Sequence, residues 1–299
     1  MKCLIIYTPH SMKGKFEKKL PFISQELSKK FDVSALKTQY EKHACKIAEE
    51  ACGVYDLILA AGGDGLVNEV INGISNQGNP PAIAVLPCGT VNDFSKSLKM
   101  PKKLDKALNV ILFVEPQFVD VMKTNSSYAC YIVCAGTHTE ATYLTRQKNK
   151  KIWGWLAYFF TAIKTIFKPL KHNFDCYVDG KKLNSSFDFV MIMNSISIAG
   201  FKLNKGAVLN DGKFDVLMLK SNKVWFRKFK KYLNLLSLFL FGVKSLKNRK
   251  QAIVIKTDNL KIVNKLNSAF NVDGEKFEAG NELNVTVLKN KIKMINNTK

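Results

Sequence analysis

The sequence predicts a mixed fold, in which an α/β domain with a parallel sheet is followed by a β-rich domain. Over residues 1–120, short apolar segments alternate with segments of helical periodicity, which is typical of βαβ units. Two of these apolar segments end in polar loops that contain glycine, at residues 62–65 and 87–94. Over residues 121–287, short alternating segments typical of strands dominate instead. We therefore expect two domains, with a boundary near residue 120.

The N-terminal domain can be followed element by element. Residues 4–7 are an apolar strand, and residues 16–30 repeat apolar side chains every three or four positions, as on one face of a helix. The further predicted elements are a strand at 31–36, a helix at 43–53, a strand at 55–61, a helix from about 65, a strand at 81–86 and a helix at 102–113. This order predicts a parallel sheet covered by helices.

The loop at residues 62–65, Gly-Gly-Asp-Gly, joins a predicted buried strand to a predicted helix. Glycines let a phosphate approach the backbone, and the free N–H groups of a helix N-terminus favour its negative charge. Asp64 could hold a metal ion that bridges phosphates, although an ordinary turn with Asp64 as N-cap is an alternative. The loop at 87–94, with Thr90 and Asp93, favours the phosphate site, because ligands of open α/β sheets lie beyond the carboxyl ends of the strands.

A third motif lies far downstream, where Asp273 and Glu275 flank a glycine. Taken alone, it is better explained as a plain Asp-Gly hairpin turn.

Composition limits the class of partner without choosing it. The chain of 299 residues has 46 Lys and Arg against 24 Asp and Glu, a formal net charge of +22. Such an excess indicates an anionic partner: nucleic acid, an acidic membrane surface or phosphorylated metabolites. The seven scattered cysteines contain no Cys-x-x-Cys pair and are expected to be small buried hydrophobes in a reducing compartment. No apolar segment is long enough for a signal peptide or a membrane span, so we expect a cytoplasmic, peripheral protein.

The β-rich half contains two segments without any acidic residue, at 141–174 and 216–257. Aromatic and basic side chains recur along both, a pattern used by helices that bind membrane interfaces. Packing of their aromatic faces on the sheet is the alternative, and no RNP, KH or zinc-finger pattern supports nucleic-acid binding. The strands predicted in this half are 128–134, 174–178, 187–193, 214–219 and 252–256, with a hairpin turn at 179–180 and final strands at 284–288 and 291–295.

The motifs GGDGLVNEVINGI (62–74), PCGTVNDF (87–94) and NVDGE (271–275) occur in the order found in the diacylglycerol kinase catalytic family. The chain resembles the bacterial soluble lipid kinases of that family over nearly its whole length, whereas GGDG alone also occurs in NAD kinases and phosphofructokinases. The resemblance implies a Rossmann-like, NAD kinase- and phosphofructokinase-like nucleotide-binding domain at 1–120, to which residues 288–299 return. It also implies a C-terminal β-sandwich domain at 121–287 that binds the lipid.

The resemblance further implies roles for particular residues. Glu275 would take the proton from the lipid hydroxyl with support from Asp273, while Asp64 and Asp93 would hold a catalytic Mg²⁺. A structural Mg²⁺ would be bound by the side chain of Asp211 and the backbone carbonyls of Val208 and Lys213. The nucleotide-binding residues implied are Thr8, Pro9, Ser11, Thr38, Gly62, Gly63, Asp64, Gly65, Asn68, Glu69 and Thr90.

Three residues depart from the family pattern: Thr8 stands for the usual Asn, Met12 for the usual Gly and Leu66 for the usual Thr. The expected reaction is transfer of the γ-phosphoryl group of ATP to diacylglycerol, giving phosphatidate at an anionic membrane surface, by a protein that the family suggests is a homodimer. The alternatives are an NAD kinase, a kinase for sphingoid bases, ceramide or phosphatidylglycerol, and a non-catalytic regulator that binds nucleotide or lipid.

Overall fold

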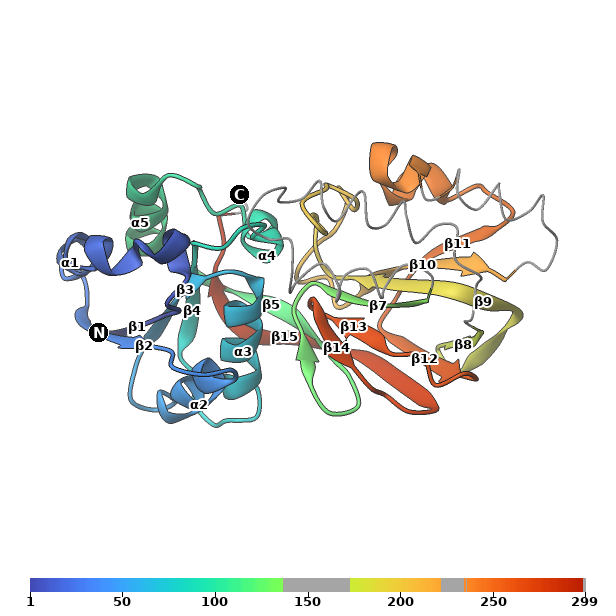
Figure 1. The fold of residues 1–299 in the computed structure, drawn as a ribbon, viewed down its shortest axis with the longest axis horizontal. Helices are drawn as coiled ribbons and strands as arrows, with labels where there is room; N and C mark the ends of the chain where they lie inside the picture. Colours follow the sequence, from blue (N-terminus) through green and yellow to red (C-terminus); the bar gives the residue numbers. More distant parts are fainter. Residues whose placement is uncertain (137–172, 222–233, 235, 298–299) are drawn as a thin grey trace. The chain divides into compact units, whose positions relative to one another are not determined.

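The computed structural model of the protein describes residues 1–136, 173–221, 234 and 236–297. The chain divides into two compact units (Figure 1). The first unit comprises Met1–Val121 and Lys289–Lys299, and the second comprises Met122–Leu288. Parallel strands alternate with helices in the first unit, and antiparallel strands dominate the second. The predicted fold class, α/β followed by β-rich, is confirmed.

The first unit is built on a parallel sheet. Its strands are β1 (Lys2–Tyr7), β2 (Asp32–Lys37), β3 (Leu57–Gly62) and β4 (Ala82–Pro87). They pair in the order β2-β1-β3-β4, and every pair is parallel. All six residues of β3 are buried, which is why its sequence is a continuous apolar run rather than an alternating one.

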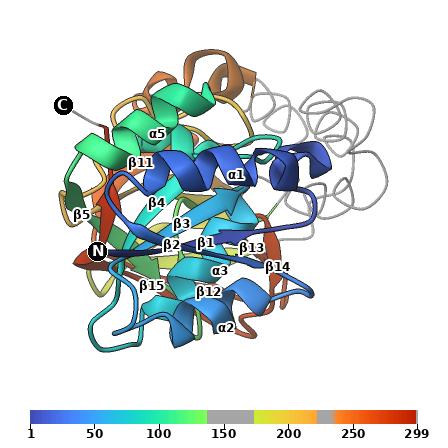
Figure 2. The same cartoon turned by 90° about the vertical axis from the view of Figure 1, so that its left-hand side faces the viewer.

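Helices cover both faces of this sheet. The helices of the unit are α1 (Phe16–Leu27), α2 (His43–Glu50), α3 (Asp64–Ile74), α4 (Asp93–Ser97) and α5 (Leu104–Phe113). Figure 2 shows α1 and α5 on one face of the sheet, and α2 and α3 on the other. The connection after β1 therefore leaves toward one face, and the connection after β3 toward the opposite face.

This arrangement creates a switch point between the neighbouring strands β1 and β3. In open α/β sheets, ligands bind at such a point, in the crevice outside the carboxyl ends of the strands. The loop after β1 begins at Thr8, and the loop after β3 begins at Gly63. The topology thus brings the first two predicted nucleotide loops to one edge of the sheet.

The second unit is an antiparallel assembly around one core. Its described strands are β6 (Tyr128–Ala129), β7 (Ile132–Gly136), β8 (Phe174–Val178), β9 (Lys181–Met193), β10 (Phe214–Lys220), β11 (Ala252–Thr257), β12 (Asn259–Asn264), β13 (Phe270–Val272) and β14 (Glu275–Phe277). Side chains from most strands of the unit, among them Val133, Phe174, Ile192 and Phe270, are buried in a single hydrophobic cluster. Asp179 and Gly180 have φ values of 49° and 78°, as expected for the predicted hairpin turn between β8 and β9.

The two final strands predicted at 284–288 and 291–295 are one strand, β15 (Glu282–Ile295). Asn290 lies within it in a left-handed conformation with φ of 52°, and its N–H donates to the Asp120 carboxylate (2.8 Å). Asparagine tolerates positive φ better than other non-glycine residues, so the chain bends there without ending the strand. Near its end β15 pairs with β4 in the parallel direction, through Met294 and Ile83.

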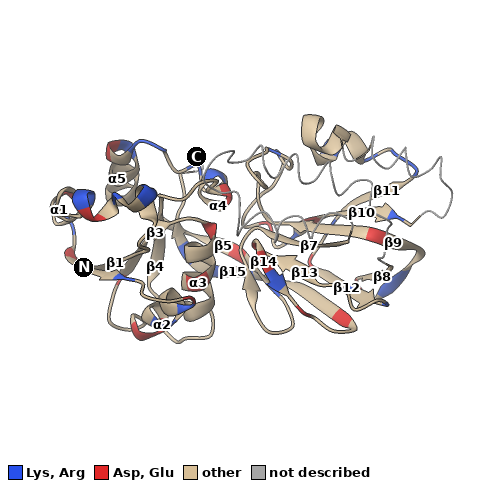
Figure 3. Ribbon diagram, viewed as in Figure 1, with Lys and Arg blue, Asp and Glu red and all other residues tan. Residues whose placement is uncertain are grey.

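Basic residues occur on elements of both units in the described part of the chain (Figure 3). Most of the acid-free segment at 141–174, and residues 222–233 and 235 of the segment at 216–257, lie outside the described residues. Among the residues that are described, no helix has the length and apolar character needed to cross a membrane.

Candidate active site

The loop after β1 is tied to the end of β3 by Ser11. The buried hydroxyl of Ser11 donates to the carbonyl oxygen of Ala61 (2.6 Å). The same oxygen of Ser11 accepts the N–H of Thr8 (3.1 Å) and lies 3.0 Å from the Thr8 hydroxyl. Thr8, one of the departures from the family pattern, therefore still takes part in a closed turn, while Pro9 is exposed on it.

The loops after β3 and β4 pack directly against each other through glycine. A Cβ atom added at Gly89 would lie only 2.4 Å from the Cα of Gly63, which no side chain can satisfy without movement of the backbone. The N–H of Cys88 also donates to the carbonyl of Gly62 (3.0 Å). Glycine is required here because two backbones approach closely.

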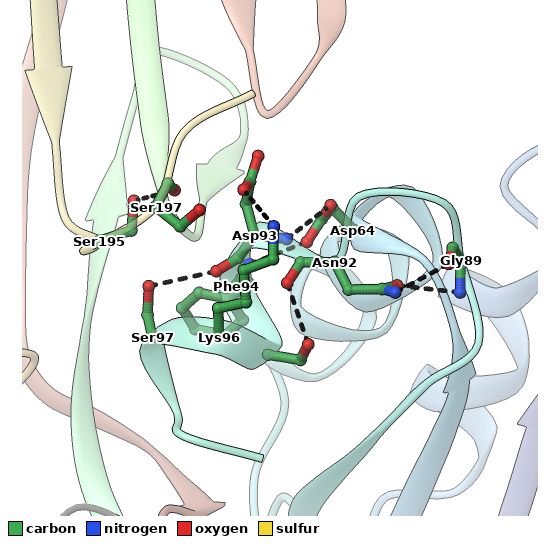
Figure 4. A network of polar contacts seen from close by, with 10 residues as sticks. Asp64, Gly89, Asn92, Asp93, Phe94, Lys96, Ser97, Ser195 and Ser197 are labelled. Carbon is green, nitrogen blue, oxygen red and sulfur yellow. Dashed lines mark hydrogen bonds and ion pairs between the residues drawn. The ribbon is translucent and has the colours of Figure 1, made fainter. Parts of the chain in front are cut away.

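Asp64 connects these two loops through its carboxylate (Figure 4). One oxygen accepts the N–H of Asp93 (3.0 Å), and the other accepts the N–H of Phe94 (2.9 Å). Asp64 therefore accepts the first two amides of α4, the helix that follows the neighbouring loop. Each carboxylate oxygen has two lone pairs, so the group can still accept further bonds or bind a cation.

Asn92, the amide residue of the loop after β4, fixes the shape of that loop (Figure 4). It has a left-handed backbone with φ of 56°, and its side-chain amide both accepts from the N–H of Gly89 (2.9 Å) and donates to its carbonyl (2.8 Å). The next residue, Asp93, is 2% exposed, and its Oδ1 lies 3.3 Å from the Nζ of Lys96. The adjoining loops after β3 and β4 thus each contribute one carboxylate, Asp64 and Asp93.

The remaining residues predicted to bind nucleotide differ in their burial and in their hydrogen-bond partners. Thr38 is buried just after β2, and its N–H donates to the carbonyl of Tyr7 (2.8 Å). Glu69 accepts the N–H of Ala44 at the start of α2 (3.1 Å), and Asn68 accepts from Asn72 one turn along α3 (3.2 Å). Gly65 lies in the first turn of α3, and Thr90 is exposed. In these contacts Glu69 and Asn68 stabilise helices. Binding of nucleotide by either residue therefore stays a prediction.

The structure explains how the departures at Met12 and Leu66 are accommodated. Leu66 is 5% exposed and packs against Gly62, so it extends the apolar core of α3. Met12 has φ of 51°, a left-handed conformation that glycine adopts without strain, and its N–H donates to the carbonyl of Cys88 (3.0 Å). Burial raises the pKa of the Cys88 thiol to about 12, so this cysteine stays protonated and unreactive.

Substitutions at Met12 should test this backbone strain. A left-handed conformation costs a non-glycine residue about 1–2 kcal/mol, and more for a β-branched one. Met12→Val should therefore lower the free energy of unfolding by about 1–2 kcal/mol, whereas Met12→Gly should leave it unchanged or raise it slightly. Urea unfolding of the wild type and the two variants measures the order of their stabilities. A Met12→Gly protein that is less stable than Met12→Val would contradict the presence of backbone strain at Met12.

In the second unit, Asp273 and Gly274 form the tight turn between β13 and β14, with φ values of 50° and 93°. Asp273 is 2% exposed, and its carboxylate accepts three consecutive backbone N–H groups, from Cys130 (2.5 Å), Tyr131 (3.0 Å) and Ile132 (3.0 Å). The next residue after the turn, Glu275, is exposed. The buried carboxylate of Asp273 thus fixes the turn that presents Glu275.

The predicted metal loop lies just before β10. Val208 is 46% exposed, and Oδ1 of Asp211 accepts the N–H of Lys213 (3.1 Å). Oδ2 of Asp211 lies 2.7 Å from Nζ of Lys256, a partner that no sequence motif predicts. Within the described residues, no group of three or more His, Cys, Asp or Glu side chains is arranged to hold a metal ion.

Comparison with known proteins identifies the family. Residues 2–124 match the family described as the diacylglycerol kinase catalytic domain. The chain is 34% identical to a diacylglycerol kinase of Staphylococcus haemolyticus over 73% of this chain and 68% of that one. It is 30% identical to a diacylglycerol kinase of Bacillus subtilis over 91% and 88% of the two chains.

Solved structures agree in fold. A protein from Bacillus anthracis str. Sterne superposes with a TM-score of 0.81 at 25% identity, covering 99% of this chain and 97% of that chain. The crystal structure of a diacylglycerol kinase from the same strain superposes with a TM-score of 0.76 at 23% identity, with the same coverage. From these similarities, the chain belongs to the diacylglycerol kinase family and is a kinase.

Proposed function

We propose that this protein is an ATP- and Mg²⁺-dependent lipid kinase that phosphorylates the free hydroxyl of diacylglycerol to give phosphatidate. The observation that carries the proposal is the joined pair of loops after β3 and β4, in which Gly63 meets Gly89 and Asp64 binds the amides of residues 93 and 94. Such a frame suits a polyphosphate, because the loop after β3 leads directly into the N-terminus of α3, where backbone N–H groups favour an anion. Membership of the family supports the lipid as acceptor.

The residues of these loops fit a catalytic Mg²⁺. Mg²⁺ is commonly bound by one or two carboxylates together with the phosphates of the substrate. Asp64 supplies one carboxylate, and Asp93 would supply a second if its buried Oδ1 exchanged the Nζ of Lys96, 3.3 Å away, for the ion. When bound, the ion would neutralise charge on the transferred phosphoryl group. The two backbone N–H bonds to Asp64 keep its carboxylate oriented whether or not the ion is present.

Glu275 is the proposed general base. It is exposed at the start of β14, and the preceding turn is fixed by the three N–H bonds to Asp273. In this proposal Asp273 is a positioning residue, and Glu275 takes the proton of the attacking hydroxyl.

Transfer of labelled phosphate from ATP should be measured with diacylglycerol in anionic mixed micelles, and separately with NAD, a sphingoid base, ceramide and phosphatidylglycerol. Labelled phosphatidate should form only with Mg²⁺ present, and kcat/KM should be highest for diacylglycerol. Preference for another lipid would reassign the acceptor, and product on NAD alone would make the protein an NAD kinase. ATP binding without any product would favour a non-catalytic regulator.

We also propose that the protein reaches its lipid by docking on an anionic membrane surface. Residues 236–241 form a helical segment. Leu240 and Phe241, at the C-terminal end of this segment, are 65% and 69% exposed. The chain that follows carries Lys244, Lys247 and Lys250, all exposed, between this helix and β11 (Figure 3). Exposed apolar side chains beside basic ones suit the boundary between acyl chains and anionic headgroups.

Replacing Leu240 and Phe241 together by serine should lower the fraction of protein that sediments with phosphatidylglycerol vesicles by about tenfold or more, because each apolar side chain adds about 1.5–3 kcal/mol when buried. Leu266→Ser is the matched control, since Leu266 is 57% exposed and adjoins Lys265 elsewhere in the same unit. Equal loss of binding in the control would show that these two residues are not the docking surface.

A further inference from the structure

The loop before β10 contains an ion pair that joins three elements. Lys256 on β11 stands opposite Asp215 on β10 in the antiparallel register. Its Nζ lies 2.7 Å from Oδ2 of Asp211 and 4.0 Å from Oδ2 of Asp215. The same oxygen of Asp215 accepts from Nδ2 of Asn204 (2.8 Å). One ammonium group therefore lies between two carboxylates that would otherwise repel each other.

A positive charge already stands where a divalent metal would bind this loop. Oδ1 of Asp211 accepts the N–H of Lys213, and Oδ2 faces the ammonium of Lys256. Mg²⁺ requires near-octahedral oxygen ligands at about 2.0–2.1 Å. An ion bound at Oδ2 of Asp211 would also be repelled by the charge of Lys256. A divalent metal and the ammonium of Lys256 would therefore compete for the same position beside Oδ2 of Asp211.

We propose that the ammonium of Lys256, not a divalent metal, is the cation that holds the loop at 208–213 against β10 and β11. The pair is partly shielded from water, with the side chains of Lys256, Asp211 and Asp215 exposed by 37%, 28% and 14%. In this chain the loop therefore keeps its conformation in the absence of Mg²⁺, and any Mg²⁺ requirement of the kinase arises elsewhere.

The test compares melting of the full-length protein, without nucleotide, in EDTA and in millimolar Mg²⁺. The wild-type Tm should be the same in both. Lys256→Met should lower the Tm in EDTA by about 2–4 °C, because the two carboxylates lose their neutralising charge. Lys256→Arg should melt like the wild type. Lys261→Met is the matched control, because Lys261 forms a similarly exposed surface pair with Glu282 (2.7 Å).

Two results would overturn the proposal. One is a rise in the wild-type Tm on addition of Mg²⁺ that is abolished by Asp211→Asn, which would place a metal at the loop. The other is a Lys256→Met protein that melts in EDTA at the wild-type temperature. Neither readout depends on which lipid is phosphorylated, so the proposal can fail while the proposed kinase activity stands.

Discussion

Replacing Glu275 by alanine is expected to lower kcat for phosphoryl transfer by about 100-fold or more, which is the usual contribution of a general base. The Tm and the KM for ATP should not change, because Glu275 is exposed and begins a short edge strand of the second unit. Steady-state kinetics with saturating lipid and a thermal melt measure the three quantities together.

Glu278→Ala is the matched control, because Glu278 lies three residues further along and is also exposed, in an ion pair with Lys276. It should retain wild-type kcat. Glu275→Asp, which keeps a carboxylate on a shorter side chain, should recover part of the activity. A Glu275→Ala protein with kcat within a few-fold of wild type would remove Glu275 from the proton transfer.

The parts of the site that could be predicted from the sequence are those with local signals. The loop at 62–65 follows a continuous apolar strand and precedes a helical pattern, and both neighbours are where the sequence indicates. Since the carboxyl ends of parallel strands converge, the loop at 87–94 could be expected beside it, as the approach of Gly63 and Gly89 confirms.

The parts that could not be predicted depend on partners distant in the chain. Nothing near Asp273 shows that its carboxylate binds amides about 140 residues earlier, at Cys130, Tyr131 and Ile132. Lys256 is likewise separated from Asp211 by 45 positions. Hydrophobic periodicity reports which face of an element is buried, but it does not report which buried polar groups meet.

Left-handed asparagines conceal two further elements from the local sequence pattern. Asn290 is a turn former by local preference, yet it lies inside β15, which replaces the two strands predicted at 284–288 and 291–295. Its left-handed backbone is compatible with the strand because Asp120 accepts its N–H. Asn92, also left-handed, precedes the five-residue helix α4, which is too short to give a periodic signal.

Replacing Asp273 by alanine is expected to destabilise the protein by at least about 3 kcal/mol, the second large effect that the structure predicts. Three backbone N–H groups, of Cys130, Tyr131 and Ile132, would lose their acceptor, and an unsatisfied buried donor costs about 1–3 kcal/mol. For a chain of this size, the Tm should fall by about 6 °C or more. Urea unfolding gives the free energy, and calorimetry gives the Tm.

Asp179→Ala provides the control for the backbone. Asp179 occupies the same position of another Asp-Gly hairpin, with φ of 49° against 50° for Asp273, so alanine brings the same left-handed strain to both turns. Asp179 is exposed, however, and its carboxylate accepts one hydroxyl, from Thr257 (2.7 Å). The difference between the two variants therefore isolates the buried carboxylate of Asp273. If both variants lose the same stability, the three N–H bonds to Asp273 contribute little to the stability of the fold.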